Sequence, residues 1–278
     1  MKTILAPTDF SPSSVNAVRY AADLAQLIDA QLVICTVIQF PVLISAIPVP
    51  ELLMEDMSEV RNRDLDSLVE SIRLRSNNQI TISRELLTGS IEHQIGSIAE
   101  IYKPLCIVMG IRKGKNFARS LFGSTIFKTL NHIPYPLLII PEYAQLESIK
   151  EIGFACDLKD SDTTTPFNTM REWLSLFNAR LDIINVSLDF NSGMVRESIS
   201  LQNHFQTFNP EFHFLDGFSL TDELQDFIRL RNLGLLIVVP KKKHGFLNFI
   251  ERRHSAEIIK HDQVPILAIP APAAINAN

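Results

Sequence analysis

The chain alternates short apolar strand-like runs with helical segments, and this order constrains its fold more than any other feature. The first half contains five runs suited to strands, at Thr3–Ala6, Leu32–Ile38, Ile80–Leu86, Leu105–Met109 and Pro136–Ile140. Such alternation is typical of parallel β-α-β units joined by right-handed crossovers. We therefore expect an α/β fold of the flavodoxin-like or Rossmann-like kind, with a five-stranded parallel sheet in the order 3-2-1-4-5 sandwiched by helices.

Helices are expected between these strands. Ser11 and Pro12 have the residue types of an N-cap and a first helical residue, and they open a helix that runs to about Ile28. The predicted inward side chains of this helix are Val15, Val18, Ala22, Ala25, Leu27 and Ile28. The other helices of the first half are expected from about Glu51 to Arg75, from Gly89 and Ser90 to Tyr102, and from Ser124 to Asn131.

The same order of segments recurs in the second half of the 278-residue chain. Its predicted strands are Ile149–Cys156, Leu181–Val186, Pro210–Leu215, Leu235–Val239 and Pro265–Pro270. We therefore predict two domains, at residues 1–143 and 147–272, joined by a short polar junction and followed by a tail at 273–278. Two copies of one fold joined so closely are expected to pack as an internal pseudo-dimer. Further association into a homodimer is left open.

Composition narrows the classes of function. The formal net charge of −5 argues against a general nucleic-acid-binding protein, because such proteins carry a broad basic surface. The cysteines Cys35, Cys106 and Cys156 lie in apolar surroundings without C-x-x-C spacing, so buried thiols are expected rather than a metal or redox site. No run reaches transmembrane length and no apolar signal region is present, so we expect a cytoplasmic protein that does not associate with a membrane.

A basic, glycine-containing loop follows the fourth predicted strand. Its distinctive residues are Gly110, Arg112, Lys113, Gly114, Lys115 and Arg119, and Gly123-Ser124-Thr125 then opens the next helix. A helix N-terminus presents free backbone N–H groups, and together with nearby cations these groups can hold phosphate. The P-loop pattern and the G-x-G-x-x-G dinucleotide fingerprint are both absent. A surface loop whose basic side chains only keep it soluble is the competing interpretation.

The predicted strand order brings two distant turns together. The first and fourth strands are neighbours in this order, and open α/β sheets bind ligands beyond the carboxyl ends of the strands where the winding direction reverses. The turn at Asp9 follows the first strand, and the loop at Gly110 follows the fourth. We therefore expect these two turns to face each other across one crevice.

These motifs resemble those of a tandem universal stress protein over essentially the whole chain. The resemblance rests on the acidic turn Ala6-Pro7-Thr8-Asp9-Phe10-Ser11, on Val-Met-Gly110, on Phe-Gly123-Ser124-Thr125 and on His132-Ile-Pro-Tyr-Pro136. The glycine pattern of nucleotide-binding members, G-x2-G-x9-G-[ST], is matched at Gly110 and at Gly123-Ser124. Lys113 stands in the second glycine position, so either Lys113 adopts that turn or Gly114 absorbs it with a one-residue shift.

The resemblance implies that the first domain binds an adenine nucleotide, with ATP as the expected ligand and Mg²⁺ as an accompanying ion. It places Asp9 near the ribose and the adenine edge, Val37 against the adenine, Gly110 against the ribose-phosphate, and the later residues around the phosphates. The residues that it implies for binding are Pro7, Thr8, Asp9, Val37, Met109, Gly110, Arg112, Lys113, Gly114, Gly123, Ser124 and Thr125. Whether ATP, ADP or AMP is bound is left open.

The second half departs from this pattern. Pro240 stands where Gly110 stood, Lys243 takes the second glycine position, and Arg252-Arg253 replaces Gly123-Ser124, while Asp157 corresponds to Asp9. Proline removes a backbone donor and arginine side chains would crowd the phosphate space, so this half is expected to be nucleotide-free. The Lys241–Lys243 cluster is interpreted as a solvated basic face, with another anion as the alternative.

Two functions of different classes follow. The first is an ATP-binding regulatory protein of the stress response, in which the nucleotide alters how the chain meets a protein partner. The second is a nucleotide-independent interaction scaffold that uses the segment 39–76 as its contact surface. No general base or nucleophile is evident beside the expected phosphates, so slow ATP hydrolysis is the most that we expect of an enzymatic activity.

Overall fold

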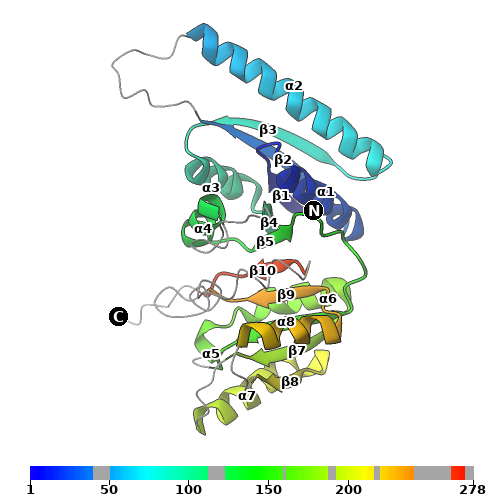
Figure 1. Cartoon of the computed structure of the whole chain (residues 1–278), viewed down its shortest axis with the longest axis vertical. Coiled ribbons are helices and arrows are strands. Elements are labelled where there is room, and N and C mark those ends of the chain that lie inside the picture. The colour runs from blue at the N-terminus through cyan, green and yellow to red at the C-terminus, as the bar shows by residue number, and fades with distance from the viewer. Residues whose placement is uncertain are drawn as a thin grey trace. The chain divides into compact units, whose positions relative to one another are not determined.

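A computed structural model describes residues 1–39, 51–111, 123–158, 161–186, 192–215, 220–240 and 264–272. The chain divides into two compact units, with the described residues up to Leu146 in the first and those from Glu147 onward in the second. Each unit is an α/β fold built on parallel strands (Figure 1). The domain limits 1–143 and 147–272, and the packing of the two copies as a pseudo-dimer, stay predictions.

The first unit contains a five-stranded sheet. Its elements are β1 (Lys2–Pro7), α1 (Pro12–Leu27), β2 (Ala30–Ile38), α2 (Glu51–Arg75), β3 (Ile82–Thr88), α3 (Ile91–Tyr102), β4 (Cys106–Ile111), α4 (Gly123–His132) and β5 (Leu137–Pro141). The strands are ordered β3-β2-β1-β4-β5 and every neighbouring pair is parallel. The predicted order 3-2-1-4-5 is therefore confirmed, and β1 and β4 are neighbours at its centre.

The second unit repeats this order. Its elements are β6 (Glu151–Cys156), α5 (Ser161–Thr164), α6 (Phe167–Phe177), β7 (Arg180–Asn185), α7 (Ser192–Phe205), η2 (Gln206–Phe208), β8 (Glu211–Phe214), α8 (Leu220–Arg231), β9 (Leu235–Val238) and β10 (Ile266–Ala268). The strands lie in the order β8-β7-β6-β9-β10, which corresponds strand by strand to the first unit. The internal repeat inferred from the sequence is thus a repeat of topology.

The apolar runs of the first unit form its core. The side chains of Ile4, Leu32 and Ile107 are fully buried in adjacent strands, as expected for a sheet covered on both faces. Two links between helices lie outside this core. Arg75 at the end of α2 is 2.7 Å from Asp23 of α1, and Lys128 of α4 pairs with Glu92 of α3.

Two details of the first unit differ from expectation. The third strand runs from Ile82 to Thr88, later than predicted, because its limits follow from pairing with Leu32–Ile38 of β2 and not from its own alternation. Helix α1 has the predicted N-cap and first residue, and Val18, Ala22 and Ala25 are buried as expected. Leu27, the last residue of the helix, was predicted to point inward but is 58% exposed.

Proline interrupts the first helical segment of the second unit. Where the first unit has one continuous helix, the second has α5, Thr165, Pro166 and then α6, with Pro166 as N-cap. A proline in a helix interior removes a hydrogen bond and clashes with the preceding turn, which accounts for the break. Trp173 of α6 is fully buried, so it belongs to the core of this unit.

None of the helices within the described ranges combines the length and the apolar character needed to cross a bilayer.

Candidate functional site

The acidic turn after β1 is held by buried hydroxyl groups. The backbone N–H of Thr8 donates to the carbonyl of Cys35 at 2.8 Å, which extends the contact between β1 and β2 by one residue. The Thr8 side chain is 6% exposed; its Oγ1 accepts the backbone N–H of Phe10 at 3.0 Å and lies 3.0 Å from Ser14 Oγ. Buried polar groups are expected to be paired in this way, so the turn is tied both to the sheet and to α1.

Asp9 presents an ionised carboxylate at the surface of this turn. Its Oδ1 accepts the backbone N–H of Ser11 at 3.0 Å. Burial raises the pKa of the Asp9 carboxyl, but hydrogen bonds from Ser11 and Ser14 outweigh that effect and hold the pKa below its ordinary value. The group therefore offers a permanent acceptor at neutral pH.

Helix α1 begins directly behind Asp9. Ser11 is its N-cap, and Ser11 Oγ accepts the backbone N–H of Ser14 at 3.4 Å. Pro12 occupies the first helical position, where a missing N–H is harmless. Asn16 then donates from Nδ2 to the carbonyls of Pro141 and Ala144, at 3.2 and 3.0 Å, which ties the helix to the end of β5.

Gly110 lies against the first turn of α1. A Cβ built on Gly110 would be 2.1 Å from the carbonyl oxygen of Ser13 and 2.5 Å from its carbonyl carbon. The strands agree with this placement, because Leu5 of β1 is in register with Ile107 of β4. The turn at Asp9 and the end of β4 therefore converge at one edge of the sheet, although they are distant in the sequence. The side-chain space of Gly110 is occupied by α1, and its contact with a ribose-phosphate stays a prediction.

Two further predicted residues flank this edge. Val37 is half-buried on β2, beyond Cys35, which is the register partner of Pro7. Met109 is 8% exposed on β4 and is in register with Ile139 of β5. Val37 and the end of β4 thus lie on opposite sides of the end of β1.

The predicted phosphate-binding residues fall in two groups. Arg112, Lys113 and Gly114 lie outside the described residues. Helix α4 begins at Gly123, one residue before the predicted start, so Gly123, Ser124 and Thr125 form its first turn. The backbone N–H groups of a first helical turn have no acceptor within the helix, so this turn can donate to an anion.

The corresponding turn of the second unit is closed by the protein itself. Leu158, which follows Asp157, has a φ of 49°, close to the 63° of Phe10 after Asp9, so both copies have a left-handed residue directly after the aspartate. The backbone N–H of Ser161, at the start of α5, donates to Glu197 Oε2 of α7 at 2.8 Å. A carboxylate of the chain thus binds the first backbone N–H of α5. Pro240 follows β9 as expected, while Lys241–Lys243 and Arg252-Arg253 lie outside the described residues.

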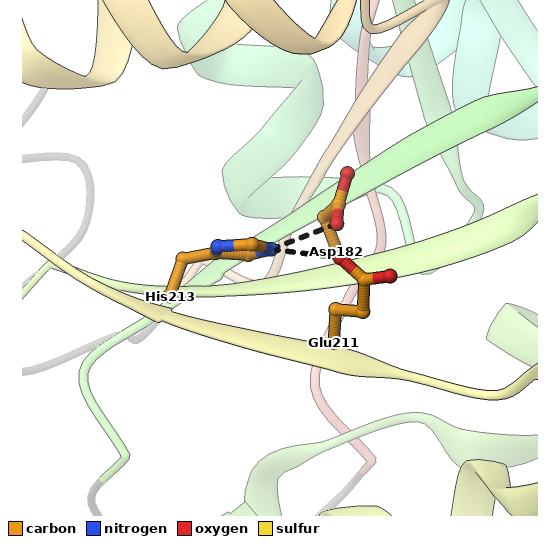
Figure 2. A group of neighbouring side chains, drawn as sticks. All are labelled: Asp182, Glu211 and His213. Atoms are coloured by element: carbon orange, nitrogen blue, oxygen red, sulfur yellow. Dashed lines mark hydrogen bonds and ion pairs between the residues drawn. The ribbon is translucent and has the colours of Figure 1, made fainter.

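The second unit also contains a cluster of charged side chains that the sequence analysis did not find. Figure 2 shows Asp182 of β7 together with Glu211 and His213 of β8, and His213 Nε2 lies 2.9 Å from Asp182 Oδ1. Two carboxylates and an imidazole are a possible ligand set for a divalent metal. In this structure the cation between the two carboxylates is the guanidinium of Arg231. Its Nη2 lies 2.8 Å from Asp182 Oδ1 and 2.5 Å from Glu211 Oε2. The one signal in the sequence was a charged residue inside the apolar run Leu181–Val186.

A second contact missed by the sequence analysis lies beside the acidic turn. The guanidinium carbon of Arg61, on α2, lies 5.3 Å from the ring centroid of Phe10. Phe10 is half-buried and adopts a left-handed backbone conformation, which is uncommon for a residue other than glycine. Nothing in the spacing of these two residues points to their contact.

The model of the universal stress protein family matches residues 1–141. A universal stress protein from Archaeoglobus fulgidus has a similar structure, with a TM-score of 0.72 and 18% identity over 97% of this chain and 96% of that one. A functionally unknown protein from Pseudomonas aeruginosa has a TM-score of 0.61 and 11% identity over 98% and 93% of the two chains. At these identities the likeness concerns the fold. No curated protein matches the chain.

The contact of Gly110 with α1 predicts opposite effects for two glycine substitutions. Gly110→Ala places a methyl group on the backbone of Ser13, which cannot move aside like a side chain, so we expect a loss of roughly 1–3 kcal/mol in the free energy of unfolding. Gly96 of α3 has nothing within 4 Å of its added Cβ, so Gly96→Ala should stabilise by about 0.5–1 kcal/mol. Urea unfolding followed by far-UV circular dichroism measures both. Equal stability of the two variants would contradict the close contact.

The Asp182 cluster predicts a local dependence of stability on one carboxylate. Asp182→Asn removes the charge that binds both Arg231 and His213, and we expect a loss of about 1.5–3 kcal/mol. Asp226→Asn is the control, because Asp226 is 69% exposed and pairs with Arg229 at 3.5 Å, which is worth at most about 0.5 kcal/mol. Trp173 is the single tryptophan and is buried in this unit, so its fluorescence during urea unfolding reports the change. A control variant as destabilised as Asp182→Asn would rule out the assigned role.

Proposed function

This chain belongs to the universal stress protein family, and we propose that its first unit binds an adenine nucleotide, with ATP as the ligand, beyond the ends of β1 and β4. The observation that carries the proposal is the convergence of the Asp9 turn with Gly110 on the first turn of α1. This is the edge at which open α/β sheets bind ligands. The bound nucleotide then regulates how the protein binds a protein partner during the stress response in the cytoplasm.

Asp9 supplies the acceptor for the nucleoside. Its carboxylate is ionised and exposed, and the turn that carries it is fixed by Thr8, Ser11 and Ser14. A ribose hydroxyl or an adenine amino group can donate to such a carboxylate. Val37, half-buried across the end of β1, supplies apolar surface for the adenine ring.

The phosphates are assigned to the β4 side of this edge, opposite Val37. The first turn of α4, at Gly123–Thr125, has backbone N–H groups without an acceptor inside the helix, and a helix N-terminus favours an anion by about 0.3–1 kcal/mol at an exposed site. The basic residues Arg112 and Lys113 add charge, with Gly114 between strand and helix. Mg²⁺ accompanies the phosphates as their counter-ion.

The second unit is assigned no nucleotide. The N–H of Ser161 is already satisfied by Glu197, so the start of its first helix does not offer a free donor there. Pro240 replaces Gly110 and brings a ring to the place where β4 needs a glycine. The second copy therefore serves as the structural partner of the first.

The scaffold alternative also has an observation in its favour. Helix α2 lies along β2 and β3 (Figure 1) and exposes apolar side chains, with Val60 at 51% and Leu74 at 66% exposure. In a nucleotide-independent scaffold, partner binding would be lost on changing these α2 residues and would persist after changes at Asp9 or Gly123–Thr125.

The proposal predicts that one of two equivalent aspartates controls ATP binding. Asp9→Asn removes a charged acceptor and should weaken ATP binding by about tenfold or more, whereas Asp157→Asn should leave the affinity unchanged. Equilibrium dialysis with labelled ATP and Mg²⁺ measures both.

Replacing Gly123 and Ser124 by arginine, as at Arg252-Arg253, should abolish binding. Wild-type protein that retains no ATP at millimolar concentration, or an equal loss in both aspartate variants, would refute the proposal.

A further inference from the structure

Phe10, in the acidic turn, has an unusual backbone conformation. Its φ of 63° places a bulky residue in the left-handed region, between the acidic Asp9 and the N-cap Ser11. Such conformations persist only where surrounding contacts determine them, and they concentrate at functional sites. The contacts that hold Phe10 therefore also determine where the Asp9 carboxylate lies.

Local hydrogen bonds supply part of this support. The N–H of Phe10 donates to Thr8 Oγ1, and the N–H of Ser11 donates to Asp9 Oδ1, both at 3.0 Å. In the second unit, the equivalent Leu158 is 2% exposed and is held by burial. Phe10 is only half-buried, and the guanidinium of Arg61 lies over its ring. The left-handed residue is thus supported by a cation in the first unit and by burial in the second.

Arg61 comes from a part of α2 that has little burial of its own. None of the described side chains between residues 55 and 64 is buried, whereas Leu65 and Leu68, further along the helix, pack into the core. Arg61 also pairs with Asp64 at 3.5 Å, and Asn62 accepts a hydrogen bond from Arg84 of β3. The Arg61–Phe10 contact joins this half of α2 to the acidic turn.

We propose that Arg61 is a positioning residue of the nucleotide site, acting through the Phe10 ring to hold the turn that presents Asp9. The inference rests on the proposed nucleotide binding. Because coupling between two sites is reciprocal, a bound nucleotide also strengthens the Arg61–Phe10 contact and so steadies the first half of α2.

The first test compares ATP affinity among four proteins by equilibrium dialysis. A cation over an aromatic ring at an exposed site accounts for about a two- to fivefold change in affinity, so Arg61→Gln should weaken ATP binding by that factor. Arg61→Lys keeps a cation and should restore most of it. Arg63→Gln is the matched control, because Arg63 is 74% exposed and pairs with Glu59 on the same helix, and it should equal wild type. Equal affinity of Arg61→Gln and wild type would overturn the inference.

A second measurement does not depend on ATP. Amide hydrogen exchange at Phe10 and Ser11, followed by NMR in nucleotide-free protein, should quicken in Arg61→Gln and not in Arg63→Gln. Unchanged exchange would show that Arg61 does not hold the turn. Faster exchange in a protein that binds no ATP would refute the proposed nucleotide while leaving Arg61 as the residue that holds the turn, so the two failures are distinguishable.

Discussion

The edge of the first sheet at which we propose nucleotide binding depends on one close contact, the backbone of Gly110 against the carbonyl of Ser13. This contact needs a residue without a side chain, since a Cβ would come within 2.1 Å of the Ser13 oxygen. It joins the end of β4 to the start of α1. In the same turn, the hydroxyls of Thr8 and Ser14 are hydrogen-bonded to each other. The acidic turn is thereby fixed at the end of β1, the central strand of the first sheet.

The two copies of the fold share a backbone conformation after the first strand but differ in the contacts around it. Both place a left-handed residue directly after an aspartate, at Phe10 and at Leu158. In the first unit the Asp9 side chain is exposed, whereas in the second the nearby N–H of Ser161 binds Glu197. The second unit instead concentrates its charge at Asp182 and Arg231, where Asp182 is 1% exposed and ties β7 to α8.

The strand order, and with it the convergence of the ends of β1 and β4 at the centre of the first sheet, could be predicted from the apolar runs of the sequence and from the rules for parallel crossovers. The conformation of Phe10, its contact with Arg61 and the pairing of Asp182 with Arg231 could not. Each depends on side chains from separate elements that tertiary packing alone brings together. The late start of β3 has the same origin, since its limits come from pairing with β2. The assignments of Arg112, Lys113 and Gly114 stay predictions.

The most direct test of the central claim is photolabelling of the intact chain with 8-azido-ATP, followed by identification of the modified peptides. The account predicts that label is found in the first unit, on the peptides that carry Val37 or the Thr8–Ser14 turn, and that excess ATP prevents it. Label confined to residues 147–278, or label that ATP does not displace, would contradict a nucleotide site between the ends of β1 and β4.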